Sequence, residues 1–162
     1  NRPSLALPAR RRLHATWILN KKTGFQLMAK KKKTANGWLF KQEPSCYSFG
    51  DLERDDTTWW DGVNNALARQ HLRAVTVGDR VLYYHTGAEK AIIGEMQVVA
   101  GPQPDPNSDD PKSVVVQVKF VRRWARPVTL AEIKADPLFA DWELIKISRL
   151  SVMPVSARAC CR

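Results

Sequence analysis

The chain has 162 residues, of which 44% are hydrophobic and 26% charged, and this balance predicts a folded protein rather than a disordered one. The net charge of +10 is concentrated at one end, because residues 1–37 hold ten Lys and Arg and no Asp or Glu, which leaves 16 basic residues against 16 acidic ones. The length excludes two well-buried domains, and the neutral remainder argues against a domain that binds phosphates broadly over its surface.

Cysteine usage and hydropathy limit the chemistry further. Cys46 and the adjacent pair Cys160 and Cys161 lack the spacing of a zinc site or a disulfide framework, and the histidines do not supply it. We therefore expect no metal and no cofactor. No apolar run approaches the roughly 18 residues of a membrane span, so we expect no membrane partner.

Residues 1–36 mix Pro, Arg and Lys without helical or strand periodicity, which predicts a basic disordered leader. Met28-Ala29-Lys30 resembles a translation start, so one interpretation is that residues 1–27 are upstream sequence and not native. The alternatives are an organellar transit peptide and a basic nuclear or phosphate-binding segment. We predict a cytoplasmic protein of bacterial type, or a nuclear or organellar protein if the leader is genuine.

The first half of the remaining chain predicts a strand followed by two helices. Residues 38–41 form the strand, which Pro44 ends. Ser48 followed by Asp51 is a capping pattern for a short helix. Apolar residues on one stripe predict a second helix over residues 64–73.

The second half predicts mainly strands. Residues 80–86 and 91–100 flank a loop at Gly87, and Gly94 marks a bulge or a close backbone approach. Residues 101–113, with four prolines, predict a loop and the most mobile internal segment, and residues 114–121 alternate like a half-buried strand. Another short helix follows at 129–132, and residues 147–155 predict a closing strand. Together these elements predict one α+β, barrel-like domain with short helices between the early strands.

Two strings carry the chemistry of a binding pocket: WLFKQEP at residues 38–44 and WWDGVNN at residues 59–65. Aromatic faces can stack a planar base, while acids, amides and a cation can bind its edge. Trp60, beside Asp61 and Gly62, is predicted to lie in a turn where its ring borders a cleft; the alternative is a ring that closes the core. Trp38 and Trp59 fit the core better.

The polar candidates in these strings each have a structural alternative. Asp61 and Asn65 could bind a base edge or cap the following helix. Gly62 could admit a ligand or allow a positive φ. Lys41 and Glu43 alternate onto one side of the first strand, where they could face a pocket together or pair with each other.

The candidates outside the two strings are also open to two interpretations. Tyr84 and His85 should point to opposite faces of their strand, so only one of them can reach a given pocket. Arg149 could bind an acidic neighbour or a phosphate. The arginines around Trp124 form either a basic patch or a solvated edge.

In order along the chain, WLFKQEP, WDGV, GDRVLYYH, IIGEMQVV and SRLSVMPV resemble the EVE domain family, and the resemblance spans residues 37–155. It implies a PUA-like β-barrel that binds a flipped, modified nucleobase of DNA or RNA without catalysis. The nucleobase-binding residues would then be Trp38, Lys41, Glu43, Trp60, Asp61, Gly62, Val63, Asn65 and His85, and the phosphate-binding residues Arg69 and Arg149.

The chain departs from the family pattern at Asn64 and Ala66, where a cation and an aromatic residue are usual, and residues 156–162 form an atypical tail. Two other hypotheses therefore stay open. One is an ASCH-like hydrolase of an acylated nucleoside, with Lys41, Glu43 and Ser48 supplying base, acid and nucleophile. The other is a protein-interaction adaptor with a vestigial pocket. We expect a monomer.

Overall fold

A computed structural model describes residues 37–155, so the predicted leader at 1–36 and the predicted tail at 156–162 lie outside the described residues. Six strands form one sheet in the order β2-β5-β4-β3-β1-β6. The elements follow one another as β1 (Gly37–Gln42), α1 (Phe49–Asp55), β2 (Thr57–Trp60), α2 (Ala66–Ala74), β3 (Arg80–His85), β4 (Ala91–Pro104), β5 (Val114–Thr129), α3 (Leu130–Ala135), the 3-10 helix η1 (Pro137–Phe139), α4 (Glu143–Lys146) and β6 (Val152–Pro154).

The sheet is mixed, because β1 pairs with β3 in parallel and the other strand pairs are antiparallel. Parallel pairing brings the ends of β1 and β3 to the same edge, and the Thr86 amide donates to the Gln42 carbonyl across it at 2.9 Å. Strands β2 and β6 are the outer strands and do not pair with each other, so the β-barrel that the family resemblance implies is not closed within the described residues. The predicted α+β class is confirmed.

Several strand boundaries differ from the predictions. β2 was not predicted, and β5 continues to Thr129 where we expected an end at residue 121. The extension is rich in arginine, yet it still pairs with the first half of β4. In contrast, the expected strand at residues 147–155 is reduced to β6, and α4 precedes it. Side-chain alternation identified the apolar half of β5 and missed the half whose charges are paired.

Local capping explains where the helices begin. Ser48 and Asp51 form a capping box at α1, and Thr129 forms one with Glu132 at α3, both as predicted. Helix α2 begins two residues later than expected because Asn65 is its N-cap. None of the helices within residues 37–155 is long and apolar enough to cross a bilayer.

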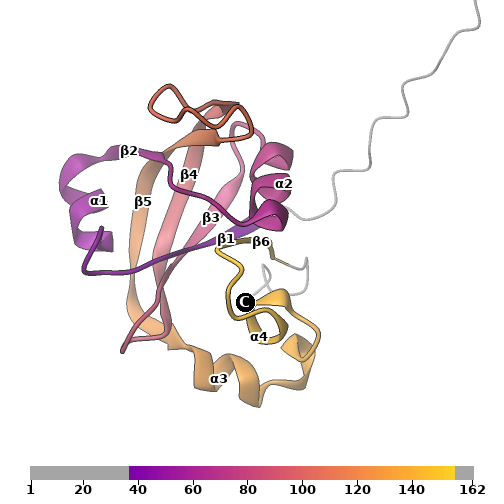
Figure 1. Cartoon of the computed structure of the whole chain (residues 1–162). Helices are drawn as coiled ribbons and strands as arrows, with labels where there is room; N and C mark the ends of the chain where they lie inside the picture. The colour runs from indigo at the N-terminus through magenta and orange to yellow at the C-terminus, as the bar shows by residue number, and fades with distance from the viewer. Residues whose placement is uncertain (1–36, 156–162) are drawn as a thin grey trace, which may run out of the picture. The chain divides into compact units, whose positions relative to one another are not determined.

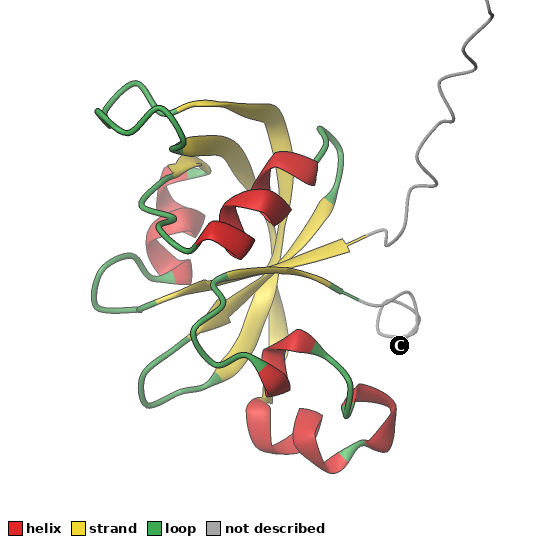
Figure 2. Cartoon of the chain, turned by 45° about the vertical axis from the view of Figure 1, so that its right-hand side comes forward, coloured by secondary structure: helices red, strands yellow, loops and turns green. Residues whose placement is uncertain are grey.

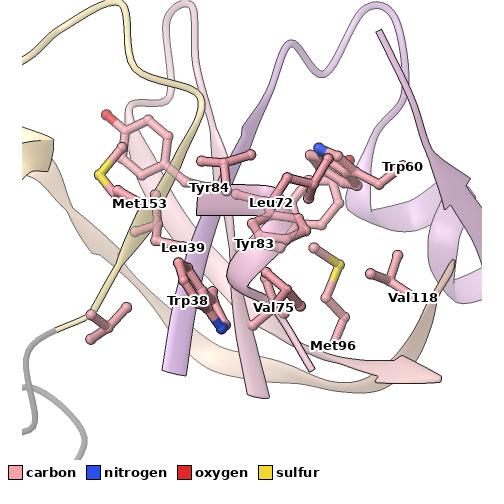
Figure 3. Close-up of a cluster of buried hydrophobic side chains, with 14 of the residues drawn as sticks. Trp38, Leu39, Trp60, Leu72, Val75, Tyr83, Tyr84, Met96, Val118 and Met153 are labelled. Atoms are coloured by element: carbon pink, nitrogen blue, oxygen red, sulfur yellow. The ribbon is translucent and has the colours of Figure 1, made fainter. Parts of the chain in front are cut away.

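The core lies between the sheet and helices α1 and α2. Figure 3 shows Trp38 and Tyr83 of the sheet and Leu72 of α2 in one buried cluster. Phe40 of β1 and Phe49 of α1 belong to the same cluster. Figure 1 shows α1 and α2 toward one end of the long strands and α3 and α4 toward the other. Figure 2 shows the same separation of the helices from a second direction.

Gly94 of β4 packs tightly against Phe49 of α1. A Cβ built on Gly94 would lie 2.5 Å from the Phe49 ring and 2.5 Å from the carbonyl oxygen of Arg122. The β4–β5 register also shifts between Ile92 and Gly94. Both features predicted for Gly94, a bulge and a close approach, are therefore present.

Candidate functional site

The two tryptophans of WWDGVNN lie on β2 and point to opposite faces. Trp59 is 42% exposed, whereas Trp60 is 6% exposed. Between ring centroids, Trp60 lies 5.1 Å from Phe40 and 5.5 Å from Tyr83. Figure 3 shows Trp60 beside Tyr83. This corrects two predictions, because Trp60 is in a strand that packs on the core and Trp59 is the exposed ring. The cause is the alternation of β2, whose pairing of Trp60 with Val116 was not visible in the sequence.

Residues 61–65 connect β2 to α2 without regular structure. They include four of the predicted nucleobase-binding residues, and for that prediction we call them the reading segment. Gly62 has φ +67°, with no atom within 4 Å of a built Cβ, so its positive φ is what requires glycine. Asp61 is exposed and Val63 is buried. The Asn65 side chain accepts from the backbone amides of Leu67 and Ala68 at 2.9 and 3.0 Å, so the capping alternative holds for Asn65.

Arg69 has its donors engaged by neighbouring groups of the protein. Its Nε donates to the Val63 carbonyl at 2.6 Å, one Nη donates to the Asn64 side chain at 3.2 Å, and the other forms a 2.7 Å ion pair with Asp110. We expected Arg69 to bind a phosphate. The structure instead directs its guanidinium inward, between the reading segment and the β4–β5 loop.

Lys41 lies away from the reading segment. It belongs to the face of β1 opposite to Phe40, and its Nζ donates to the Ser148 carbonyl at 2.6 Å, 5.8 Å from the centre of the Tyr84 ring. Burial lowers the pKa of Lys41 below its ordinary value. Arg149, next to this carbonyl, is exposed. Lys41 and Trp60 therefore cannot contact one base while each keeps its present face.

Glu43 and His85 occupy the edge where β1 and β3 end. Glu43 accepts from the Thr86 hydroxyl, so it does not pair with Lys41. His85 Nε2 accepts from the Phe49 amide at 3.0 Å, which places the ring proton on Nδ1, 2.5 Å from a Glu89 carboxylate oxygen. Both imidazole nitrogens are thus engaged, on the opposite face from Tyr84, as the alternation predicted.

Trp38, the remaining candidate, is a core residue as its own alternative predicted. Its indole Nε1 donates to the buried Asp79 carboxylate at 2.9 Å. Of the predicted nucleobase-binding residues, the structure brings Trp60, Asp61, Gly62, Val63 and Asn65 together in one stretch. Lys41 lies on the opposite face of the sheet, whereas Trp38 shares the buried cluster with Trp60. The His85 ring lies 5.5 Å from the Tyr83 ring, which in turn lies 5.5 Å from the Trp60 ring.

A cleft of about 770 Å³ on the other face of the sheet was not predicted. Its walls include Trp124, Phe139 and Trp142, between the strands and the α3–α4 region. Beside it, the buried Glu95 accepts from Arg122 at 2.7 Å, from Trp124 Nε1 at 3.0 Å and from Arg80. The only sequence signal was a single acid within the apolar run at residues 91–96.

All three arginines of β5 form ion pairs with nearby acids. Arg122 binds Glu95, Arg123 binds Glu53 at 2.9 Å, and Arg126 binds Glu132. The arginines around Trp124 therefore form a paired edge rather than a free basic patch, which was the alternative interpretation.

The sequence model of the EVE domain matches residues 36–160. The chain belongs to the EVE domain family. Human thymocyte nuclear protein 1 is 35% identical over an alignment of 160 positions that covers 77% of this chain and 71% of the human protein.

Solved structures agree with this assignment. An NMR structure of Rpa0253 from Rhodopseudomonas palustris is 40% identical, with a TM-score of 0.71, and the match covers 75% of this chain and 86% of that one. The crystal structure of human THYN1 protein in complex with 5-methylcytosine-containing DNA is 31% identical, with a TM-score of 0.68, covering 75% and 91% of the two chains. The PUA-like fold expected of the EVE domain is thereby confirmed.

The residues considered for hydrolysis are not assembled in this EVE domain. The Ser48 hydroxyl donates to Asp51 at 2.7 Å within the α1 cap, and Lys41 and Glu43 have the separate partners given above. A nucleophile needs a base within hydrogen-bond reach, and Ser48 has only a carboxylate that also caps the helix. Within residues 37–155, no group of three or more His, Cys, Asp or Glu is placed to hold a metal ion.

Proposed function

We propose that this EVE domain is a non-enzymatic reader of a modified nucleobase, and that the base is a modified cytosine, such as 5-methylcytosine, in DNA. The observation that carries the proposal is the likeness to human THYN1 protein, which was solved in complex with 5-methylcytosine-containing DNA. At 31% identity and with 91% of that chain covered, the two proteins share the whole domain rather than one motif.

The reading segment is the proposed site of base recognition. It joins the Trp60 ring to an exposed carboxylate at Asp61 and an exposed amide at Asn64. A carboxylate can accept from the exocyclic amine of cytosine, and an aromatic ring that stacks a base contributes about 1–3 kcal/mol. Because Trp60 is only 6% exposed, a base can stack on its face only after neighbouring groups move.

The test is a titration of the full chain with duplexes that carry one central 5-methylcytosine, 5-hydroxymethylcytosine, N6-methyladenine or unmodified base. We expect tighter binding to a duplex with a modified cytosine than to the unmodified one. Asp61→Asn should reduce the ratio of the two affinities, while Asp109→Asn, which changes another exposed aspartate, should not. Equal affinities of the wild-type protein for all four duplexes would refute the proposal.

A second pair of variants distinguishes base binding at Trp60 from base binding in the cleft on the other face. Trp60→Phe keeps a ring in the core and should weaken binding, whereas Phe139→Ala, in the cleft on the other face, should leave the ratio unchanged. The opposite result would place the base in the cleft. The same titration with single-stranded modified RNA tests whether the domain prefers RNA.

Two remaining predictions belong to this proposal. We propose that the protein acts as a monomer, which light scattering of the free protein and of its complex with DNA measures. The curated relatives are named nuclear proteins, and this supports the nuclear alternative for the location rather than the bacterial-type cytoplasmic one. A fluorescent fusion with and without residues 1–36 tests that alternative.

A further inference from the structure

We infer that Arg69 is a positioning residue that fixes the reading segment, and that Asp110, from the loop between β4 and β5, holds Arg69 in place for this role. The effect that we expect on the preference for a modified base rests on the proposed function. The effect that we expect on the order of residues 61–65 in the free protein does not.

The geometry places one guanidinium between two parts of the chain that are distant in sequence. On one side it donates to the Val63 carbonyl at 2.6 Å and to the Asn64 side chain at 3.2 Å. On the other side it pairs with Asp110 at 2.7 Å. The arginine side chain is 13% exposed and the aspartate side chain 43% exposed, so the pair is shielded mainly on the arginine side.

The planar guanidinium explains why arginine suits this position. Three acceptors lie in three directions around it, and its donors have a fixed fork geometry that can serve all three at once. A lysine ammonium on a flexible stem carries the same charge without that geometry. Arg69 comes from α2, whose first turn is capped by Asn65, so the reading segment is held at its end by the cap and along its length by Arg69.

The loop that carries Asp110 is itself well connected. The Lys112 amide donates to the Asp110 carboxylate at 2.9 Å, and Arg73 donates to the Lys112 carbonyl at 2.5 Å. The Lys112 amide and then Arg69 lower the pKa of Asp110. The loop that composition predicted to be the most mobile internal segment is thus attached to α2 by two arginines, Arg69 and Arg73.

These contacts distinguish positioning from phosphate binding. If Arg69 bound a phosphate, Asp110 would compete with the DNA for the guanidinium. Removing the Asp110 carboxylate would then tighten binding to every duplex, and the slope of affinity against salt concentration would steepen by about the contribution of one phosphate contact. If Arg69 positions the reading segment, removing the carboxylate loosens residues 61–65 and reduces the preference for the modified base. The salt dependence then stays as it was.

The first experiment is amide hydrogen exchange of the free full-length protein, read on a peptide that covers residues 61–65. Asp110→Asn should speed exchange there about three- to tenfold, the usual effect of losing one partly shielded charged hydrogen bond. Asp109→Asn, at the neighbouring exposed position, is the matched control and should leave the exchange unchanged. Arg69→Lys should speed exchange as much as Asp110→Asn, because a lysine keeps the charge but lacks the fixed donor geometry of the guanidinium. Unchanged exchange in Asp110→Asn, or full rescue by Arg69→Lys, would overturn the inference.

The second experiment is the titration with modified and unmodified duplexes at several salt concentrations. We expect Asp110→Asn to lower the ratio of the two affinities with an unchanged salt dependence. An unchanged ratio, or tighter binding to both duplexes with a steeper dependence, would also overturn the inference. If the wild-type protein shows no preference, the proposed function fails, and hydrogen exchange still decides the role of Arg69 in the free protein.

Discussion

Replacing Glu95 by glutamine tests the buried charge cluster on β4. The Glu95 side chain is 6% exposed, whereas those of its partners Arg80 and Arg122 are 54% and 62% exposed. Glutamine removes the charge and keeps one carbonyl oxygen that can still accept from the Trp124 indole. The variant therefore loses charged hydrogen bonds without leaving an arginine buried.

The size of the expected stability loss follows from the contrast between the buried Glu95 and its exposed arginine partners. A hydrogen bond to a charged group contributes about 1.5–3 kcal/mol, but burying the carboxylate costs part of that gain. Breaking a buried pair whose remaining charge stays buried costs about 3–5 kcal/mol, and here both arginines can return to water. We expect Glu95→Gln to lower the free energy of unfolding by about 1–3 kcal/mol near neutral pH.

The stability difference between wild type and Glu95→Gln should also depend on pH. Burial raises the pKa of Glu95, but hydrogen bonds from Arg122, Arg80 and Trp124 more than compensate, so the pKa lies below its ordinary value of 4.5. A carboxylate with a lowered pKa in the folded state stabilises the protein above its unfolded pKa, and this stabilisation is lost as the pH falls through the folded value. The difference between wild type and Glu95→Gln should therefore be constant above about pH 5 and shrink below 4.5.

Urea unfolding of both proteins, near neutral pH and at about pH 3.5, measures this difference. Glu53→Gln is the control, because it weakens an exposed pair with Arg123, the neighbour of Arg122 on β5, and it should change stability by less than about 1 kcal/mol. A Glu95→Gln protein as stable as wild type near neutral pH, or a difference that persists in full at low pH, would refute the reasoning.

Three further predictions concern backbone packing, capping and charge. Gly94→Ala places a Cβ against the Phe49 ring and should lower stability by about 2–3 kcal/mol in urea unfolding, whereas Gly101→Ala, whose nearest neighbour would be 3.8 Å away, should change it by less than about 0.5 kcal/mol. Asn65→Ala removes the α2 cap and should cost about 1 kcal/mol in thermal unfolding, with no comparable loss for the exposed Asn107→Ala. Deleting residues 1–36 should flatten the salt dependence of DNA binding, because residues 37–155 contain 14 Lys and Arg and 16 Asp and Glu; an equally steep dependence after the deletion would contradict this.

Local signals in the sequence predicted the parts of the fold that local physics decides. The capping boxes at Ser48 and Thr129 and the glycine at residue 94 were each found where predicted, because the residues that explain them are few and their chemistry is specific. The strand β2 was missed because its four residues lie next to a turn-like Asp-Gly pair and pair with a strand almost sixty residues later. Such a partner leaves no trace in the periodicity of β2.

In the candidate site, too, local features were predicted and contacts between distant residues were not. The two strings supplied the stretch of polar residues on which the proposal rests. Alternation along β1, however, sends Lys41 to one face while Phe40, which contacts Trp60, points to the other. The ion pair between Arg69 and Asp110 joins positions that are 41 residues apart, and the acidic, proline-rich loop around Asp110 predicted mobility rather than attachment. The sequence supplied the residue types of the site, while only the fold shows which of them share a face.

The low exposure of Trp60 determines which binding measurement is informative. If a base can stack on Trp60 only in a conformation that the free protein populates rarely, the apparent affinity is reduced by that population, so a form present at about 1% weakens binding about 100-fold. Modified and unmodified bases require the same rearrangement, and its free energy therefore cancels in the ratio of their affinities. A weak but selective interaction would thus support the reader hypothesis, whereas a tight interaction without selectivity would point to the basic residues 1–36. The ratio also isolates Arg69, because a positioning residue changes how well the two bases are distinguished, and a phosphate contact changes both affinities alike.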